Sequence, residues 1–197
     1  MPATVTVSTT LATPVPTATP YPGALSLNQP ATFGKADRTG KAIVYKAELR
    51  SNYSWSSPSF NSAHEQAQAG AALGTQQGYN TQEPAAGNTF LFTYIRITGT
   101  GTTSLVAPSP NQFTVNYDGK NYAYSSVRGS DVTVGTVRVP QYDYTIGTGG
   151  VAGYVQPGDS NAADGFLIFE VPESTDLSKA ALVITLDSDN KAAWKLA

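Results

Sequence analysis

The side chains that could carry out chemistry are few in this sequence, and their types restrict what it can do. The 197 residues include no cysteine and a single histidine, His64, which precedes Glu65. Without cysteine there is no disulfide, thiol nucleophile or thiolate metal site, and one histidine cannot form a multi-histidine metal centre. Serine hydrolysis requires a base beside the nucleophile, and the sequence has no Gly-x-Ser-x-Gly motif. We therefore interpret His64 as a solvated loop residue.

Carboxylates are the remaining candidates for catalysis. The acid–base pair of a glycoside hydrolase could be drawn from Glu48, Glu83, Glu170 and Glu173. Glu48 falls on a predicted solvent face and Glu170 beside a predicted strand end, which does not favour a shared cleft. We predict that the protein is not an enzyme and uses no cofactor.

An acidic turn near the C-terminus contains oxygen ligands of the kind that calcium prefers. Asp187 and Asp189 lie in the run Asp-Ser-Asp-Asn. Calcium takes roughly six to eight oxygens. Lys191 occupies a ligand position of an EF-hand loop and the turn glycine is missing, so an EF-hand is excluded. Two interpretations stay open: an irregular calcium site at the end of the fold, or a solvated turn.

Two further kinds of site fall in the segment that follows residue 50. Asn52, in Asn-Tyr-Ser, is the only acceptor sequence for N-glycosylation, and its alternative is an unmodified turn. Tyr53, Trp55 and Phe60 lie among serine and asparagine residues, where aromatic rings suit stacking on sugars. The alternative is that Trp55 folds back and covers the core, because tryptophan is highly buried on average.

Most of the chain reads as short strands that would position these residues. Residues 42–50 alternate, with Ile43, Tyr45, Ala47 and Leu49 predicted on the buried face and Val44 on the polar face. Residues 90–97 are apolar on both faces, as expected of a central strand. Asp118-Gly119 predicts a hairpin after residues 112–117.

The C-terminal half continues this pattern. Residues 131–139 read as one strand with a bulge at Gly135, and residues 165–171 and the segment around Ile184 as two more. Trp194 is predicted to close one end of the core. About seven short strands separated by turns indicate an all-β, antiparallel β-sandwich.

The first 23 residues differ in composition from the rest. Five prolines among Thr, Val, Ser and Ala predict an extended stalk or tail over 1–23, followed by one domain over 24–197. Residues 3–11 alternate in a way that suits a strand added to a neighbouring subunit. We expect an exported chain, extracellular or at the cell surface, whose signal or anchor has been removed. The alternative is a cytosolic protein with an extended terminus.

Charge and the larger insertions complete the sequence-based expectations. A net charge of -2 and a pI near 5.3 give no electrostatic footprint for nucleic acid or anionic lipid. Residues 62–78 are rich in Ala, Gln and Gly and read as an insertion with at most two helical turns. Residues 145–164 form a long Gly-rich loop. Such loops are where a specific function would be found.

Five segments in order resemble a known family. They are 87–92 (GNTFLF), 109–113 (SPNQF), 118–122 (DGKNY), Pro157-Gly158 and 165–172 (GFLIFEVP). Together they resemble the domain of unknown function 4352, over roughly residues 24–197. The resemblance implies an immunoglobulin-like β-sandwich in secreted or surface-anchored bacterial and archaeal proteins, with no agreed catalytic or ligand residues.

These observations predict a non-catalytic structural or interaction module at the cell surface. Its expected partner is a surface protein or a second copy of the chain, engaged through the tail strand at residues 3–11. The alternative is a carbohydrate-binding module that uses Tyr53, Trp55 and Phe60 to bind a glycan.

Overall fold

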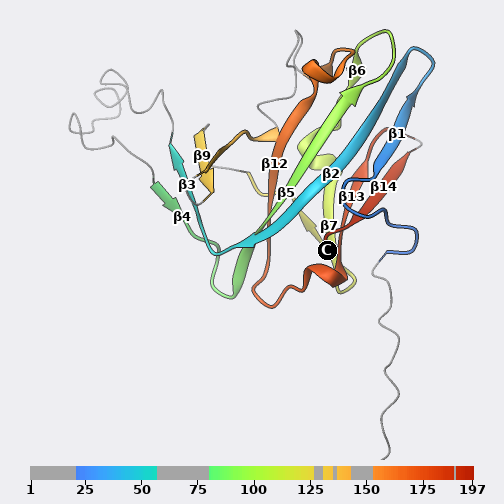
Figure 1. The fold of residues 1–197 in the computed structure, drawn as a ribbon. Helices are drawn as coiled ribbons and strands as arrows, with labels where there is room; N and C mark the ends of the chain where they lie inside the picture. The colour runs from blue at the N-terminus through green and yellow to red at the C-terminus, as the bar shows by residue number, and fades with distance from the viewer. Residues whose placement is uncertain (1–20, 57–79, 127–130, 135–136, 143–152, 189) are drawn as a thin grey trace, which may run out of the picture.

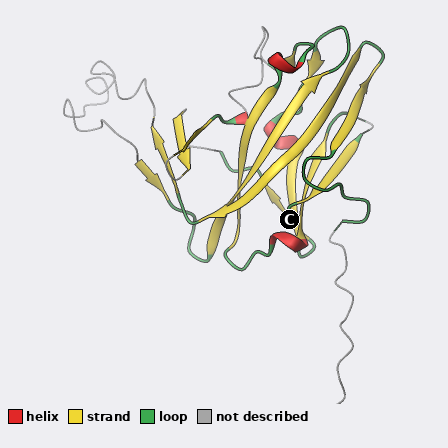
Figure 2. Ribbon diagram, viewed as in Figure 1, coloured by secondary structure: helices red, strands yellow, loops and turns green. Residues whose placement is uncertain are grey.

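The computed structural model describes residues 21–56, 80–126, 131–134, 137–142, 153–188 and 190–197. These residues form an antiparallel β-sandwich of two four-stranded sheets, with a smaller sheet packed outside (Figures 1 and 2). The all-β antiparallel sandwich predicted from the strand pattern is confirmed. Residues 1–20 of the predicted stalk, the insertion at 62–78 and residues 145–152 of the Gly-rich loop lie outside the described residues.

The main sheet has the order β1-β2-β5-β12. Its strands are β1 (Pro30–Lys35), β2 (Arg38–Arg50), β5 (Asn88–Gly99) and β12 (Ala163–Pro172). The facing sheet has the order β14-β13-β7-β8. Its strands are β14 (Lys191–Lys195), β13 (Ala180–Thr185), β7 (Phe113–Tyr117) and β8 (Lys120–Ala123).

A smaller outer sheet has the order β10-β9-β3-β4. It contains β3 (Tyr53–Ser56), β4 (Asn80–Gln82), β9 (Asp131–Val134) and β10 (Val137–Val139). Two short strands, β6 (Leu105–Val106) and β11 (Tyr154–Val155), pair with each other. Three 3-10 turns are η1 (Pro110–Gln112), η2 (Asp159–Asn161) and η3 (Leu177–Lys179).

The main core lies between the main and facing sheets. Leu91, Ile95 and Leu167 of the main sheet pack in one cluster with Val115 and Leu182 of the facing sheet. Trp194 is fully buried in this cluster, as predicted, and its Nε1 donates a hydrogen bond to the carbonyl oxygen of Gln29 at 2.8 Å. Each fully buried large apolar side chain contributes about 1.5–3 kcal/mol of transfer free energy.

A second apolar cluster lies on the other face of the main sheet. Phe90 and Phe92 of β5 and Phe166 of β12 point to this face and pack with Tyr53 of β3 and Val132 of β9. The outer sheet therefore covers part of the main sheet. In Figure 1 its strands β3, β4 and β9 lie to the left of the main sheet. Burial on both faces explains why residues 90–97 carry apolar side chains on both faces, as the sequence predicted for a central strand.

The alternation predicted for residues 42–50 is wrong at Val44. Val44 is 0% exposed in the main core, whereas Ile43 is only half-buried. The pairing of β2 with β5 shifts between Val44 and Lys46, so Tyr45 is an extra residue in the strand. A bulge of this kind reverses the phase of the side chains, so Ala47 and Leu49 return to the main core beyond it.

The hairpin and bulge predictions in the second half have opposite outcomes. Asp118 and Gly119 have positive φ values of 50° and 72° and join β7 to β8, so the predicted hairpin is confirmed. Residues 131–139 are two antiparallel strands, β9 and β10, with Val134 opposite Val137. The prediction of one bulged strand over these residues is therefore wrong, and Gly135, the predicted position of the bulge, lies outside the described residues.

Gly165, the first residue of the GFLIFEVP segment, lies where another part of the chain crosses β12. A Cβ atom at Gly165 would lie 2.6 Å from the backbone nitrogen of Tyr142. The next residue, Phe166, donates its backbone N–H to the carbonyl oxygen of Pro140 at 3.1 Å. Glycine is required here by close approach of two backbones.

No helix of the described residues is long and apolar enough to cross a membrane.

Candidate functional site

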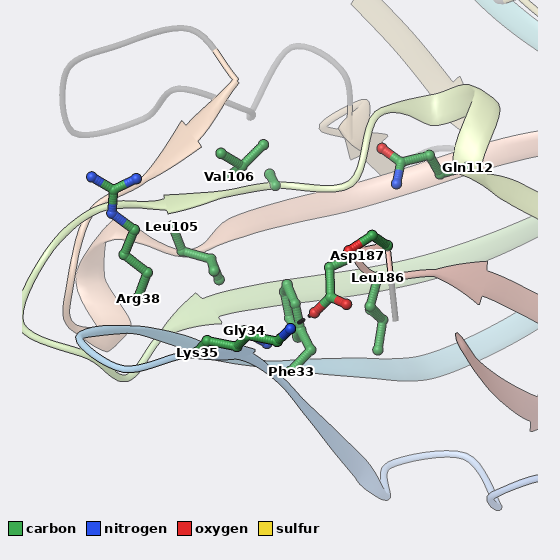
Figure 3. A pocket seen from close by; sticks show the side chains of 11 residues that line it. Phe33, Gly34, Lys35, Arg38, Leu105, Val106, Gln112, Leu186 and Asp187 are labelled. Carbon is green, nitrogen blue, oxygen red and sulfur yellow. Dashed lines mark hydrogen bonds between the residues drawn. The ribbon is translucent and has the colours of Figure 1, made fainter. Parts of the chain in front are cut away.

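An open pocket of about 350 Å³ lies at one end of the sandwich (Figure 3). We call it the end pocket. Its apolar wall is formed by Phe33 of β1, Leu105 of β6 and Leu186, which follows β13, and each of these is at most 5% exposed. The complete lining is Phe33, Gly34, Lys35, Arg38, Leu105, Val106, Ala107, Gln112, Leu186, Asp187 and Ser188.

The turn between β1 and β2 forms one side of the end pocket. Lys35 and Arg38 are opposite each other in the β1–β2 ladder. Gly34 has a φ of +88°, and a Cβ atom there would lie 2.1 Å from the carbonyl oxygen of Arg38. A side chain at this position would therefore distort the turn that presents Lys35 and Arg38 to the pocket.

Asp187 connects the opposite side of the end pocket to β1. Its Oδ2 accepts a hydrogen bond from the backbone N–H of Gly34 at 3.1 Å, shown as a dashed line in Figure 3. Its Oδ1 accepts from the backbone N–H of Asn190 at 3.0 Å, and the Asn190 side-chain amide donates to both oxygens at 2.9 and 2.8 Å. The carboxylate is thus held by the protein's own donors and closes the turn after β13.

Beside the end pocket, two exposed apolar side chains form a ledge. Among the described residues three large hydrophobic side chains are exposed, and two of them, Val106 (56%) and Tyr154 (37%), are partners across β6 and β11. Cross-strand partners share one face of a sheet. Val106 also lines the pocket, so the apolar surface continues from the pocket onto this ledge.

Apart from the end pocket, a cluster of hydrogen-bonded polar side chains lies on the outer face of the main sheet. The Tyr45 hydroxyl donates to Asp164 Oδ1 at 2.7 Å, and Arg96 Nη1 donates to Asp164 Oδ2 at 3.0 Å. The Tyr94 hydroxyl donates to Glu48 Oε1 at 2.6 Å. Burial first, and then the neighbouring carboxylate, raises the pKa of Tyr45 and of Tyr94 above the ordinary tyrosine value.

These tyrosines remain protonated donors at neutral pH, which is what the hydrogen-bonded carboxylates require. Burial opposes ionisation of Glu48, but hydrogen bonds from Tyr94, Lys46 and Arg50 outweigh it and hold the pKa of this carboxyl below its ordinary value. The cluster can therefore tie β2, β5 and β12 together as a charge-assisted network. Since its polar groups satisfy one another, we take the end pocket as the candidate site.

The structure describes two of the three residues that the sequence grouped as a sugar platform. Tyr53 is 3% exposed, with its ring centroid 5.2 Å from that of Phe90. Trp55 is half-buried and packs against the same second cluster. Both belong to strand β3. Phe60 lies outside the described residues.

The remaining predicted positions are Asn52 and the two aspartates of the acidic turn. Asn52 is exposed between β2 and β3, where an acceptor asparagine is accessible. Asp187 lines the end pocket, and Asp189 lies outside the described residues. The described residues contain no group of three or more His, Cys, Asp or Glu side chains arranged to hold a metal ion.

Sequence reasoning missed the apolar part of the end pocket. Phe33, Leu105 and Leu186 come from three distant segments, and in the sequence each looks like any other core residue. The one signal available was Val106, an apolar residue next to Leu105 in a segment too short to alternate. Its exposure can be recognised only once the β6–β11 pairing is known.

The comparisons with known proteins concern the fold. No family model and no curated protein matches the chain, so the resemblance to the domain of unknown function 4352 stays a prediction. Among solved structures, the chain is similar to a secreted protein of Mycobacterium tuberculosis, MPT63, at 16% identity, with 89% of this chain and 98% of that chain covered and a TM-score of 0.47.

It is also similar to an uncharacterised β-sandwich protein of Clostridium difficile 630, at 13% identity, with 87% of this chain and 91% of that chain covered and a TM-score of 0.45. A conserved hypothetical protein of Bacillus anthracis has 13% identity, with 85% of this chain and 93% of that chain covered and a TM-score of 0.43. The chain is an antiparallel β-sandwich with similarity to bacterial proteins of this kind.

Proposed function

We propose that this chain is a non-catalytic binding module of an exported or cell-surface protein, and that it binds an apolar small molecule in the end pocket. The observation that carries the proposal is the pocket itself, at about 350 Å³ with Phe33, Leu105 and Leu186 in its wall. Small-molecule sites are typically about 300–1,000 Å³ and mostly apolar, with a few polar groups that fix orientation.

The polar groups of the pocket support a binding role. Asp187 is held by Gly34 and Asn190, and Gln112 donates from Nε2 to the carbonyl oxygen of Thr185 at 2.7 Å. Such side chains maintain the shape of the pocket. Export is supported by the proline-rich segment at 1–23 and by the family resemblance of residues 24–197.

The end pocket accounts for a binding function better than the two sites predicted from sequence. A sugar platform would need Tyr53 at the surface, and Tyr53 packs against Phe90 and Phe92. Self-association through residues 3–11 involves a segment outside the described residues, and its support is the β-branched alternation of that segment alone.

The proposal is tested by titrating the full chain with N-phenyl-1-naphthylamine, a neutral probe whose fluorescence rises in apolar surroundings. We expect saturable binding at one probe per chain. Val106→Glu places a charge at the pocket mouth and should weaken binding about tenfold, which is about 1.4 kcal/mol. Ala123→Glu adds the same charge on an exposed position of β8, outside the pocket, and should leave binding unchanged.

Absence of saturable binding to the wild-type chain would contradict the proposal. An equal loss of probe affinity in Val106→Glu and Ala123→Glu would also contradict the proposal, because the effect would then come from the change in net charge and not from the pocket. Circular dichroism of the three proteins establishes that all are folded.

A further inference from the structure

The mouth of the end pocket carries a positive charge that no other described residue pairs with. Arg38 lines the pocket, and its guanidinium has no hydrogen-bond or ion-pair partner among the described residues. Lys35, the other cation of the turn, does have an interaction partner. Asp187 is the acidic group in the lining, and its two oxygens accept hydrogen bonds from Gly34 and Asn190. Arg38 is therefore the group available to a ligand.

Arg38 and the apolar ledge lie on the same side of the pocket. Figure 3 shows the Arg38 side chain extending from the β1–β2 turn toward the side on which Val106 lies, above the wall formed by Leu105 and Phe33. Val106 is 56% exposed, and Tyr154, its cross-strand partner on β11, is 37% exposed. Exposed apolar side chains beside an unpaired cation form a surface with one apolar part and one positive part.

We propose that the end pocket binds an amphiphile that has a single apolar chain and an anionic head group. The apolar chain lies against Phe33, Leu105 and Leu186, and the head group is bound by Arg38 at the mouth. Guanidinium groups bind carboxylates and phosphates through two parallel hydrogen bonds, which gives this position its preference for an anion. The inference rests on the proposed binding function and adds the charge of the ligand to it.

The charge preference is tested with three ligands that share one chain length: octanoate, octanol and octylammonium. In isothermal titration calorimetry of the full chain, octanoate should bind about fivefold more tightly than octanol. This difference equals about 1 kcal/mol, as expected for a partly exposed ion pair. Octylammonium should bind most weakly. Added sodium chloride should weaken the binding of octanoate and leave the binding of octanol unchanged, because salt screens the ion pair.

Arg38→Gln should reduce octanoate affinity about fivefold, to the value of octanol, and should leave octanol affinity as it is. The matched control is Lys120→Gln, which removes one positive charge at the β7–β8 turn, outside the pocket, and should retain the preference. Equal affinities for octanoate and octanol in the wild-type chain would overturn the inference, and so would an unchanged preference in Arg38→Gln.

The same chemistry could come from a free acid or from an anionic lipid in a bilayer, and a second arm separates the two. The chain is mixed with phosphatidylglycerol vesicles and floated on a density gradient, with and without octanoate. If the chain floats with the vesicles and octanoate abolishes this flotation, the ligand is an anionic lipid. If the chain binds octanoate but does not float, the ligand is a free acid. If the neutral naphthylamine probe binds but octanoate shows no preference, the pocket function stands and only the anionic ligand is wrong.

Discussion

Tyr45 and Tyr94 place their hydroxyl groups against carboxylates on a face of the main sheet that the outer sheet covers only in part. Their ring centroids are 5.9 Å apart, and each hydroxyl donates to a different acid, Asp164 or Glu48. Lys46 Nζ lies 4.8 Å from the Tyr94 ring centroid. At the scale of single residues, charge-assisted hydrogen bonds add to the second apolar cluster in stabilising this face, whereas the opposite face carries the main core.

Glu48→Gln tests the contribution of this network through its pH dependence. The pKa of Glu48 is lowered in the folded chain below its ordinary value of 4.5, so ionised Glu48 stabilises the fold above that pH. This stabilisation is lost as the pH falls through the folded pKa. Urea denaturation should therefore show Glu48→Gln less stable than the wild type at pH 7, with the difference narrowing below about pH 4.5.

Tyr94→Phe serves as the companion variant in this experiment. It removes the hydrogen bond to Glu48 Oε1 and keeps the ring, so it should weaken the pH dependence without abolishing it. A stability difference between wild type and Glu48→Gln that stays constant from pH 7 to pH 3 would show that the carboxylate is not engaged as described.

At the scale of elements, the bulge in β2 determines which side chains reach the core. Alternation from Ala47 and Leu49, which do pack on the main core, extends backwards to Tyr45 and Ile43. One extra residue at Tyr45 breaks that phase and turns Val44 and Ala42 inward instead. The bulge also directs Tyr45 toward Tyr94 and Asp164, so it creates part of the polar network.

Truncation of two adjacent residues distinguishes this register from simple alternation. Val44→Ala should cost about 2–3 kcal/mol of unfolding free energy, because it leaves a cavity in the main core. Ile43→Ala removes one more carbon but should cost only about 1 kcal/mol, since Ile43 is half-buried. Urea denaturation of both variants measures the difference. A larger loss for Ile43→Ala would place Ile43, not Val44, in the core.

At the scale of the whole molecule, the main sheet carries apolar clusters on both of its faces. Leu91 and Ile95 of β5 face the main core, and Phe92 faces the second cluster beneath the outer sheet. The outer sheet is made of short strands, of three or four residues each. Such a sheet depends on the second cluster for its position, because small isolated sheets are only marginally stable.

Tyr53→Ala should release the outer sheet while the sandwich remains intact. Tyr53 is 3% exposed and contacts Phe90 and Phe92 from β3. Hydrogen–deuterium exchange should rise in β3 and β9, with β7 and β13 as protected as in the wild type.

Val115→Ala, in the main core, is the matched comparison and should reduce protection in β7 and β13. If Tyr53→Ala accelerated exchange equally in all strands, the outer sheet and the sandwich would unfold as one unit.

The sequence alone was sufficient for features that depend on local pattern. The strand-rich architecture, the hairpin at Asp118-Gly119, the central position of residues 90–97 and the burial of Trp194 were all predicted. Each follows from near-neighbour chemistry, namely apolar periodicity or a positive φ at a turn.

Only the tertiary structure decided the register of β2, the division of residues 131–139 into two strands and the composition of the end pocket. The physical reason is that these features depend on partners distant in the sequence. A bulge is defined by the strand opposite, and a pocket by side chains from separate segments, such as Phe33, Leu105 and Leu186. The sequence pattern shows which residues are apolar, but the tertiary fold determines which side chains each of them contacts.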